Sequence, residues 1–176
     1  MRALLRHMVP ILLMPFMVVV AVPLWLLTAF ADLDRRVSGN SLMFEIVGGI
    51  VITSGLALFT WCVSLFARIG KGTLAPWDPT RSLVGVGPYR VVRNPMILGV
   101  ALMLFGQALF RGSLVLGLWC CVFILINHVY FVLSEEPGLV KRFGKDYIAY
   151  KEHVPRWVPR LRRLPDRNNT NPTRQG

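Results

Sequence analysis

The sequence is short of acidic residues and of cysteine, and each shortage excludes a class of protein. Only 9 of the 176 residues are Asp or Glu, against 20 Lys or Arg, and charged residues of both signs make up 16% of the chain. So few charges cannot cover the surface of a soluble domain of this size. The three cysteines, Cys62, Cys120 and Cys121, lie inside apolar runs without metal-ligand spacing. We therefore expect no disulfide framework, no redox centre and no metal site.

Sequence signals for β-structure and for a nucleotide-binding sheet are also missing. The chain has no Gly-x-Gly-x-x-Gly motif and little that is typical of strands. Since that glycine pattern is the signature of the doubly wound dinucleotide fold, a Rossmann domain is not expected.

Long apolar runs dominate the chain instead. Hydrophobic residues make up 54% of the sequence, and the mean hydropathy is +0.52. About 20 residues are enough for a helix to cross a bilayer. The sequence predicts an all-α integral membrane bundle of about four transmembrane helices, drawn from four uncharged runs: Val9–Ala31, Ile46–Ala67, Pro95–Phe110 and Gly112–Ser134. Only Arg111 separates the last two, which indicates a tight helical hairpin.

The first run has a second interpretation, as a cleaved signal peptide. Basic residues precede it, and Ala29-Phe30-Ala31 resembles a cleavage site. The run is longer than the roughly 7–15 apolar residues of a signal peptide, which favours a membrane span. Its prolines predict a kinked helix whose freed backbone groups neighbouring helices must satisfy: Pro10, Pro15 and Pro23.

The distribution of positive charge sets the expected orientation. All but three of the 20 Lys and Arg residues fall in the N-terminus, the second loop or the segment after Ser134. Four crossings with both termini in the cytoplasm satisfy the positive-inside rule. We expect an integral protein of a bacterial inner membrane. Because the charge follows the membrane rule, no nucleic-acid partner is expected.

The second loop is too structured to be a simple connector. Residues 71–95 are longer than most helix–helix connections, and they contain four prolines and three glycines, which fix turns. Trp77 and Tyr89 lie among them. A long, stiff, basic loop with aromatic residues indicates a binding surface, with an interfacial anchor as the alternative.

A second polar cluster follows the fourth run. The segment Ser134–Pro137 has the pattern of a helix start, with a Ser cap and acids in the first turn. Apolar residues at helical spacing then predict one amphipathic helix along the membrane surface: Leu139, Phe143, Tyr147, Tyr150 and Val154. Compensation of the helix dipole is the alternative role for Glu135 and Glu136.

Asn127 and His128 are polar residues inside a predicted span, where such side chains often mark a site. His128 lies seven residues before Glu135, so the two would share a face of a regular helix. A packing role is the alternative for His128. The loop and the Glu135 segment both fall on the cytoplasmic side. We expect them to meet there as a cytoplasmic cap, open to water and to lipid.

Two motifs in these clusters resemble those of the isoprenylcysteine carboxyl methyltransferase and phospholipid methyltransferase group of membrane methyltransferases. The first is GPYRVVRNPMI at 87–97, against a family pattern of roughly Gly-x-Tyr-x-x-x-Arg-His-Pro-x-Tyr. The second is Glu135-Glu136, followed by FGKDYIAY at 143–150 and by Val154-Pro155. The resemblance covers about half of the chain, with both motifs in the correct order.

The resemblance implies S-adenosylmethionine as the methyl donor, bound without a Rossmann domain. It assigns cofactor contacts to Arg81, Ser82, Leu83, Val84, Tyr89, Arg93, Asn94, Pro95, Met96, Ile97, Glu135 and Glu136. We hypothesise that Glu135 binds the ribose hydroxyls or the amino group, and that Arg93 binds the carboxylate. Tyr89 would pack on the adenosine. His128 would be the catalytic base for an amine or hydroxyl acceptor.

Three departures from the family pattern bear on the acceptor. Asn94 stands where the carboxyl methyltransferases have His, and Ile97 where they have Tyr. Phe131 replaces the Arg that would suit a substrate carboxylate. Carboxyl methylation of a prenylated protein is therefore not expected. The acceptor is instead a lipophilic small molecule or lipid: a phospholipid amine, an isoprenoid, or a small apolar thiol or acid.

Two other functions remain open from the sequence. An NADPH-dependent membrane reductase of related architecture would use Arg90, Lys141 and Arg142 for a 2′-phosphate. A non-enzymatic membrane protein would bind anionic lipid or a partner through its basic tail. We expect one domain over residues 1–160 and a basic, disordered tail over 161–176. The oligomeric state is left open.

Overall fold

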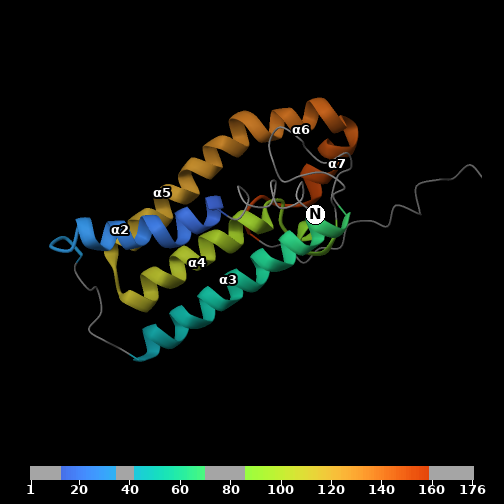
Figure 1. Cartoon of the computed structure of the whole chain (residues 1–176). Helices are drawn as coiled ribbons and strands as arrows, with labels where there is room; N and C mark the ends of the chain where they lie inside the picture. The colour runs from blue at the N-terminus through green and yellow to red at the C-terminus, as the bar shows by residue number, and fades with distance from the viewer. Residues whose placement is uncertain (1–12, 35–41, 70–85, 159–176) are drawn as a thin grey trace, which may run out of the picture.

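The computed structural model describes residues 13–34, 42–69 and 86–158, and within these ranges the chain is helical with no β-strand (Figure 1). The predicted tail at 161–176 lies outside these ranges. The elements, with η for a π- or 3₁₀-helix, are η1 Met17–Ala21, α2 Val22–Ala29, α3 Leu42–Ile69, η2 Gly87–Arg90, α4 Pro95–Arg111, α5 Leu114–Tyr130, η3 Phe131–Glu135, α6 Glu136–Phe143 and α7 Lys145–His153.

The helices have the length and surface of a membrane bundle. Leu42–Leu65 and Leu114–Phe143 are long and apolar enough to cross a membrane, and Leu13–Ala29 and Pro95–Arg111 are shorter apolar helices. Only 22% of the apolar window in each long helix is buried inside the protein. A core helix of a soluble protein would be mostly buried, so these outward-facing apolar side chains require lipid. The predicted all-α membrane bundle is confirmed.

Helix α4 lies at the centre of the bundle, with α3 on one side and α2 and α5 on the other (Figure 1). Glycines bring α3 and α4 into backbone contact. A Cβ added at Gly55 would lie 2.7 Å from the Gly99 carbonyl oxygen, and one at Gly106 would lie 2.9 Å from that of Gly48. Gly48 and Gly55 of α3 lie seven residues apart, as do Gly99 and Gly106 of α4, so each pair lies on one face of its helix. Membrane helices associate through such close packing because the hydrophobic effect does not drive helix association within lipid.

The first helix contains a π turn next to a proline. The Val22 N–H donates to the Met17 carbonyl, five residues earlier. In a regular α-helix it would donate to the Val18 carbonyl, four residues earlier. Pro23 has no N–H to donate to Val19. The carbonyls of Val18 and Val19 therefore both lose their donors within the helix.

Side chains of two neighbouring helices satisfy these carbonyls. Trp119 Nε1 of α5 donates to the Val18 oxygen at 3.1 Å. Gln107 Nε2 of α4 donates to the Val19 oxygen at 2.9 Å. In lipid an unsatisfied backbone carbonyl is costly, so these contacts hold the first helix against the bundle. The prediction of a proline-disturbed helix supported by its neighbours is confirmed at Pro23.

The turn between α4 and α5 is as tight as predicted. Gly112 adopts a left-handed conformation at φ +57°. Ser113 is buried, and its hydroxyl accepts from the Leu116 N–H while donating to Asp34 Oδ1 at 2.6 Å. The Ser113 side chain thus caps the start of α5 and ties the turn between α4 and α5 to Asp34 in the segment after α2.

The predicted helix start at Ser134 is wrong. Helices α5, η3 and α6 form one continuous rod, because η3 continues the chain through a π turn without a cap. The single amphipathic helix predicted to follow is also wrong. It is broken at Gly144, whose φ of +52° favours glycine, and α7 turns back towards the start of α4 (Figure 1). Tyr147 and Val154 still point inward and are buried.

Candidate active site

The end of the second loop is packed into the protein rather than left on its surface. Gly87 adopts φ +57°, and a Cβ there would lie 3.0 Å from a methyl carbon of Leu65 in α3. Tyr89 is buried, and its carbonyl accepts the Tyr150 hydroxyl of α7 at 2.6 Å. Burial raises the pKa of both tyrosines, so both stay neutral near pH 7. The loop therefore rests on α3 and α7.

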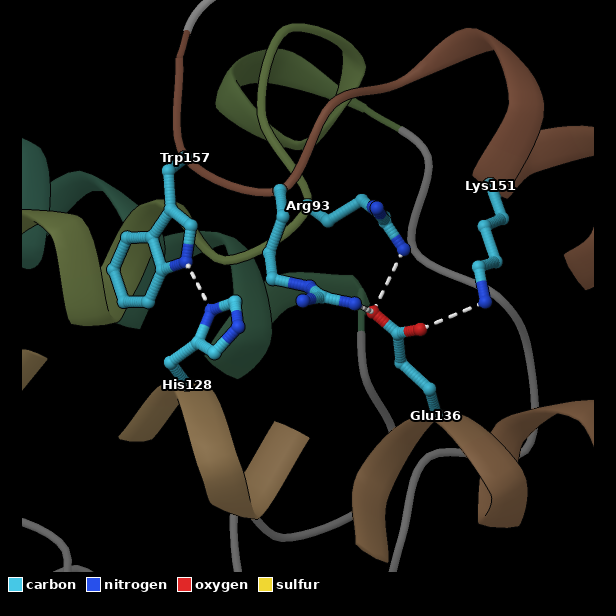
Figure 2. Close-up of polar contacts among 6 residues, drawn as sticks. Arg93, His128, Glu136, Lys151 and Trp157 are labelled. Atoms are coloured by element: carbon cyan, nitrogen blue, oxygen red, sulfur yellow. Dashed lines mark hydrogen bonds and ion pairs between the residues drawn. The ribbon is translucent and has the colours of Figure 1, made fainter. Parts of the chain in front are cut away.

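One buried carboxylate, that of Glu136, joins three parts of the chain (Figure 2). Its Oε1 accepts from Arg93 Nη1 and from Arg156 Nε, each at 2.8 Å. Its Oε2 lies 2.9 Å from Lys151 Nζ. Glu136 is 6% exposed, and a buried charge is stable only when it is paired. The three cations come from the loop, from α7 and from the segment after α7, so Glu136 ties these parts together.

Arg93 is held from two directions. Its guanidinium meets Glu136, and its backbone N–H donates to the Pro155 carbonyl at 2.9 Å. The two sequence motifs are therefore in direct contact, as expected from their placement. The Arg93 Nε is buried and has no hydrogen-bond partner among the residues that the structure describes. Such an orphaned donor is rare in native proteins.

Glu135 differs from its neighbour. It is half-buried, and within the described ranges it makes no hydrogen bond or ion pair. After the larger effect of burial, its negative charge contributes to the raised pKa of both Tyr89 and Tyr147. Its carboxylate thus lies close enough to influence the loop on one side and α7 on the other, and it has its hydrogen-bonding capacity to spare.

The π turn η3 changes which residues share a face. It inserts one extra residue between His128 and the acidic pair, a rotation of about 100° in α-helical terms. His128 therefore aligns with Glu136, and the predicted alignment with Glu135 is wrong. The segment after α7 contacts both His128 and Glu136. Arg156 contacts Glu136, whereas Trp157 donates its Nε1–H to His128 Nδ1 at 3.2 Å (Figure 2).

The remaining predicted contacts lie at the start of α4 or outside the structure. Asn94 is half-buried at the N-terminal end of α4 and makes no side-chain cap. Pro95 is buried, and Met96 and Ile97 pack against the core. Residues Arg81–Val84 lie outside the described ranges. The cofactor contacts assigned to all of these residues stay predictions.

Sequence reasoning missed Lys151, Arg156 and Trp157. Their partners lie far away in sequence, so spacing gave no sign of them. One signal in the sequence could have indicated them. An acidic pair is followed by an excess of Lys and Arg residues, and a carboxylate that becomes buried needs a positively charged partner. Phe131 is buried and its ring lies 5.9 Å from that of Trp157. Phe131, which stands where the carboxyl methyltransferases have Arg, therefore makes an aromatic contact instead.

The fold and the joined motifs define a class of protein, the all-α membrane methyltransferases. Residues 43–146 match the phospholipid methyltransferase family, and this match spans more than half of the chain. The protein belongs to the phospholipid methyltransferase family. This membership favours a methyltransferase over a reductase or a lipid-binding protein without activity.

Relatives with assigned names are methyltransferases as well. Methanethiol S-methyltransferase 2 of Bradyrhizobium diazoefficiens is 35% identical over 91 residues, which is 48% of this chain and 32% of that protein. Methanethiol S-methyltransferase of Pseudomonas deceptionensis is 35% identical over 78 residues, 44% of this chain and 28% of that protein. The chain thus spans about a third of the length of these relatives.

An uncharacterized protein of Haemophilus influenzae is 33% identical over 63 residues, which is 36% of this chain and 100% of that protein. No solved structure matches the chain.

Proposed function

We propose that the protein transfers a methyl group from S-adenosylmethionine to a small apolar or lipophilic acceptor at the cytoplasmic membrane face, and that the acceptor is a thiol. Membership of the phospholipid methyltransferase family supports methyl transfer. The observation that carries the proposal is a pair of groups where the two motifs meet, Glu135 and Arg93 Nε, which have no hydrogen-bond partner among the residues that the structure describes.

These two groups fit the proposed donor. The amino group and the ribose hydroxyls of S-adenosylmethionine can donate hydrogen bonds to a carboxylate, and its own carboxylate can accept from a guanidinium N–H. Glu135 has free acceptors, and Arg93 Nε is a free donor among the described residues. Glu136 is occupied on both oxygens by cations of the protein. We therefore assign Glu135 to the cofactor and Glu136 to holding the site together.

When bound, S-adenosylmethionine supplies an activated methyl group on a sulfonium sulfur. The residues of this chain then have two tasks, alignment and exclusion of water. Tyr89 and Tyr147 are neutral side chains close enough to Glu135 for its charge to raise their pKa, after the larger effect of burial. Tyr150 donates its hydroxyl to the Tyr89 carbonyl, and the bulk of the three rings would help to exclude water from the site. The excess of Lys and Arg on this side favours a cytoplasmic location for this end of the bundle, where the cofactor would be available.

The acceptor class is proposed from the relatives and from the composition of the site. Two relatives are named as methyltransferases of methanethiol, a small apolar thiol. Phe131 and Trp157 pack together where a carboxylate substrate would require a cation. The helix between His128 and Glu135 presents Val132 and Leu133 outward, towards lipid. An apolar acceptor can approach by this route.

The test is methyl transfer by the purified full chain in detergent. Methyl-labelled S-adenosylmethionine is supplied with an alkanethiol, a long-chain amine or a long-chain carboxylic acid, and NADPH oxidation is followed in parallel. We expect label in the thioether product. Label in the amine or ester alone would overturn the thiol assignment, and NADPH oxidation without methyl transfer would overturn the proposed function.

A further inference from the structure

The hydrogen bond between Trp157 and His128 fixes the position of a proton. An indole N–H can only donate, so the atom 3.2 Å from it, His128 Nδ1, must be the acceptor. A nitrogen that accepts carries no proton. Neutral His128 therefore has its proton on Nε2, with its lone pair directed at Trp157.

His153 provides the opposite case in the same protein. Its Nδ1 lies 2.8 Å from the Ala149 carbonyl oxygen, one turn earlier in α7. A carbonyl can only accept, so Nδ1 of His153 must carry a proton. The two histidines thus hold different nitrogens protonated, and for each the reason is the chemistry of its partner.

The position of His128 places its Nε2–H where an apolar acceptor would arrive. His128 lies eight residues before Glu136, two helical turns or roughly 12 Å deeper into the apolar part of the rod. It is exposed there, and its Nε2 has no hydrogen-bond partner in the part of the chain that the structure describes. A polar N–H in a membrane helix needs an acceptor, and ionisable side chains in such helices often mark a substrate pathway.

We propose that His128 binds the methyl acceptor by donating Nε2–H to a thiolate sulfur, and that it is not a general base. The lone pair that a base would use is engaged by Trp157, so His128 could take the proton of an amine acceptor only by giving up that contact. A thiol instead loses its proton to water, and a donated hydrogen bond favours the thiolate.

This proposal rests on the proposed function. In the methyl transfer, the thiolate sulfur contributes the electron pair of the new S–C bond. The bond between the methyl carbon and the sulfonium sulfur breaks, its pair stays on that sulfur, and two neutral thioethers result. No proton moves to His128 in this step.

Two substitutions at His128 distinguish a hydrogen-bond donor from a general base. His128→Gln retains an N–H donor near the Nε2 position but has no basicity, and His128→Leu removes both. We expect the Gln variant to keep kcat/KM for an alkanethiol within about fivefold, and the Leu variant to lose about 10- to 100-fold, the worth of a hydrogen bond to a charged group. Equal loss in both variants at the 10²–10⁴-fold level of a missing base would overturn the proposal. So would full activity in both.

A spectroscopic measurement tests the same proposal without turnover. Long-range ¹H–¹⁵N spectra of the full chain report which imidazole nitrogen carries the proton, and His128→Gln identifies the His128 signals. We expect His128 to be protonated on Nε2 and His153 on Nδ1 at neutral pH. Trp157→Phe should abolish the preference at His128 alone. A neutral His128 protonated on Nδ1 would overturn the proposal.

The two measurements also separate this inference from the proposed function. The expected His128 proton position, together with no methyl transfer to any acceptor by the wild-type chain, would mean that the proposed function has failed and the acceptor role with it. If the wild-type chain methylates an amine and His128→Gln abolishes this activity, the proposed methyltransferase function would stand and the donor role of His128 would be overturned.

Discussion

Substitution of Gly55 by alanine tests whether backbone contact holds α3 against α4. The added Cβ would lie 2.7 Å from the Gly99 carbonyl oxygen and 2.9 Å from the Met103 nitrogen. The first distance is 0.7 Å shorter than the 3.4 Å at which ordinary contact begins. Both neighbours are backbone atoms, which no side-chain rotation can move away. The two helices must therefore separate locally.

The expected magnitude follows from two opposing effects. Overpacking of this kind costs about 1–3 kcal/mol, and a separation of 0.5–1 Å forfeits about a quarter to a half of the dispersion energy of the atoms concerned. Alanine in a helix gains about 0.5–1 kcal/mol over glycine. The net loss for Gly55→Ala is about 1–2 kcal/mol.

Gly49 provides the matched control on the same helix, since a Cβ there meets nothing within 4 Å. Gly49→Ala should be neutral or stabilising. The difference between the two variants, about 1–3 kcal/mol, isolates the overpacking cost. The assay is reversible unfolding in mixed micelles with rising SDS content, followed by tryptophan fluorescence. Equal stability of the two variants, within about 0.5 kcal/mol, would refute the contact.

Three further substitutions test contacts that hold the bundle and the site together. Gln107→Leu should cost about 1–3 kcal/mol in the same unfolding assay, because the Val19 carbonyl loses its donor. Ser113→Ala should cost about 1 kcal/mol through loss of the α5 cap, and no loss would contradict the cap. Glu136→Gln removes the charge shared by three cations, so trypsin should cleave residues 145–158 at least tenfold faster. Glu152→Gln, an exposed control on α7, should leave this rate unchanged.

The fold could be predicted from the sequence because long uncharged runs have few alternatives to helices in a membrane. The meeting of the two motifs could also be predicted, since both lie on one side of a small bundle. The glycine contacts between α3 and α4 were not predicted. The seven-residue spacing of Gly48 with Gly55 and of Gly99 with Gly106 is visible in the sequence, but its meaning depends on which helices are neighbours.

The orientation of the acidic pair could not be predicted. A π turn adds one residue without changing the apolar pattern, because η3 is apolar in Phe131, Val132 and Leu133 alike. That residue decides that Glu136, and not Glu135, aligns with His128 and meets the cations. The break at Gly144 was hidden for a similar reason, since Tyr147 and Val154 continue the apolar spacing after it and are buried.

The central claim is that Glu135 binds S-adenosylmethionine where the loop meets the acidic pair. The direct measurement is calorimetric titration of S-adenosylmethionine into the folded full chain in detergent, compared with Glu135→Gln and with Glu152→Gln. We expect saturable binding at one site, weakened at least about tenfold by Glu135→Gln and unchanged by Glu152→Gln. Absence of binding to the folded wild-type chain, or equal affinity in the Glu135→Gln variant, would contradict it.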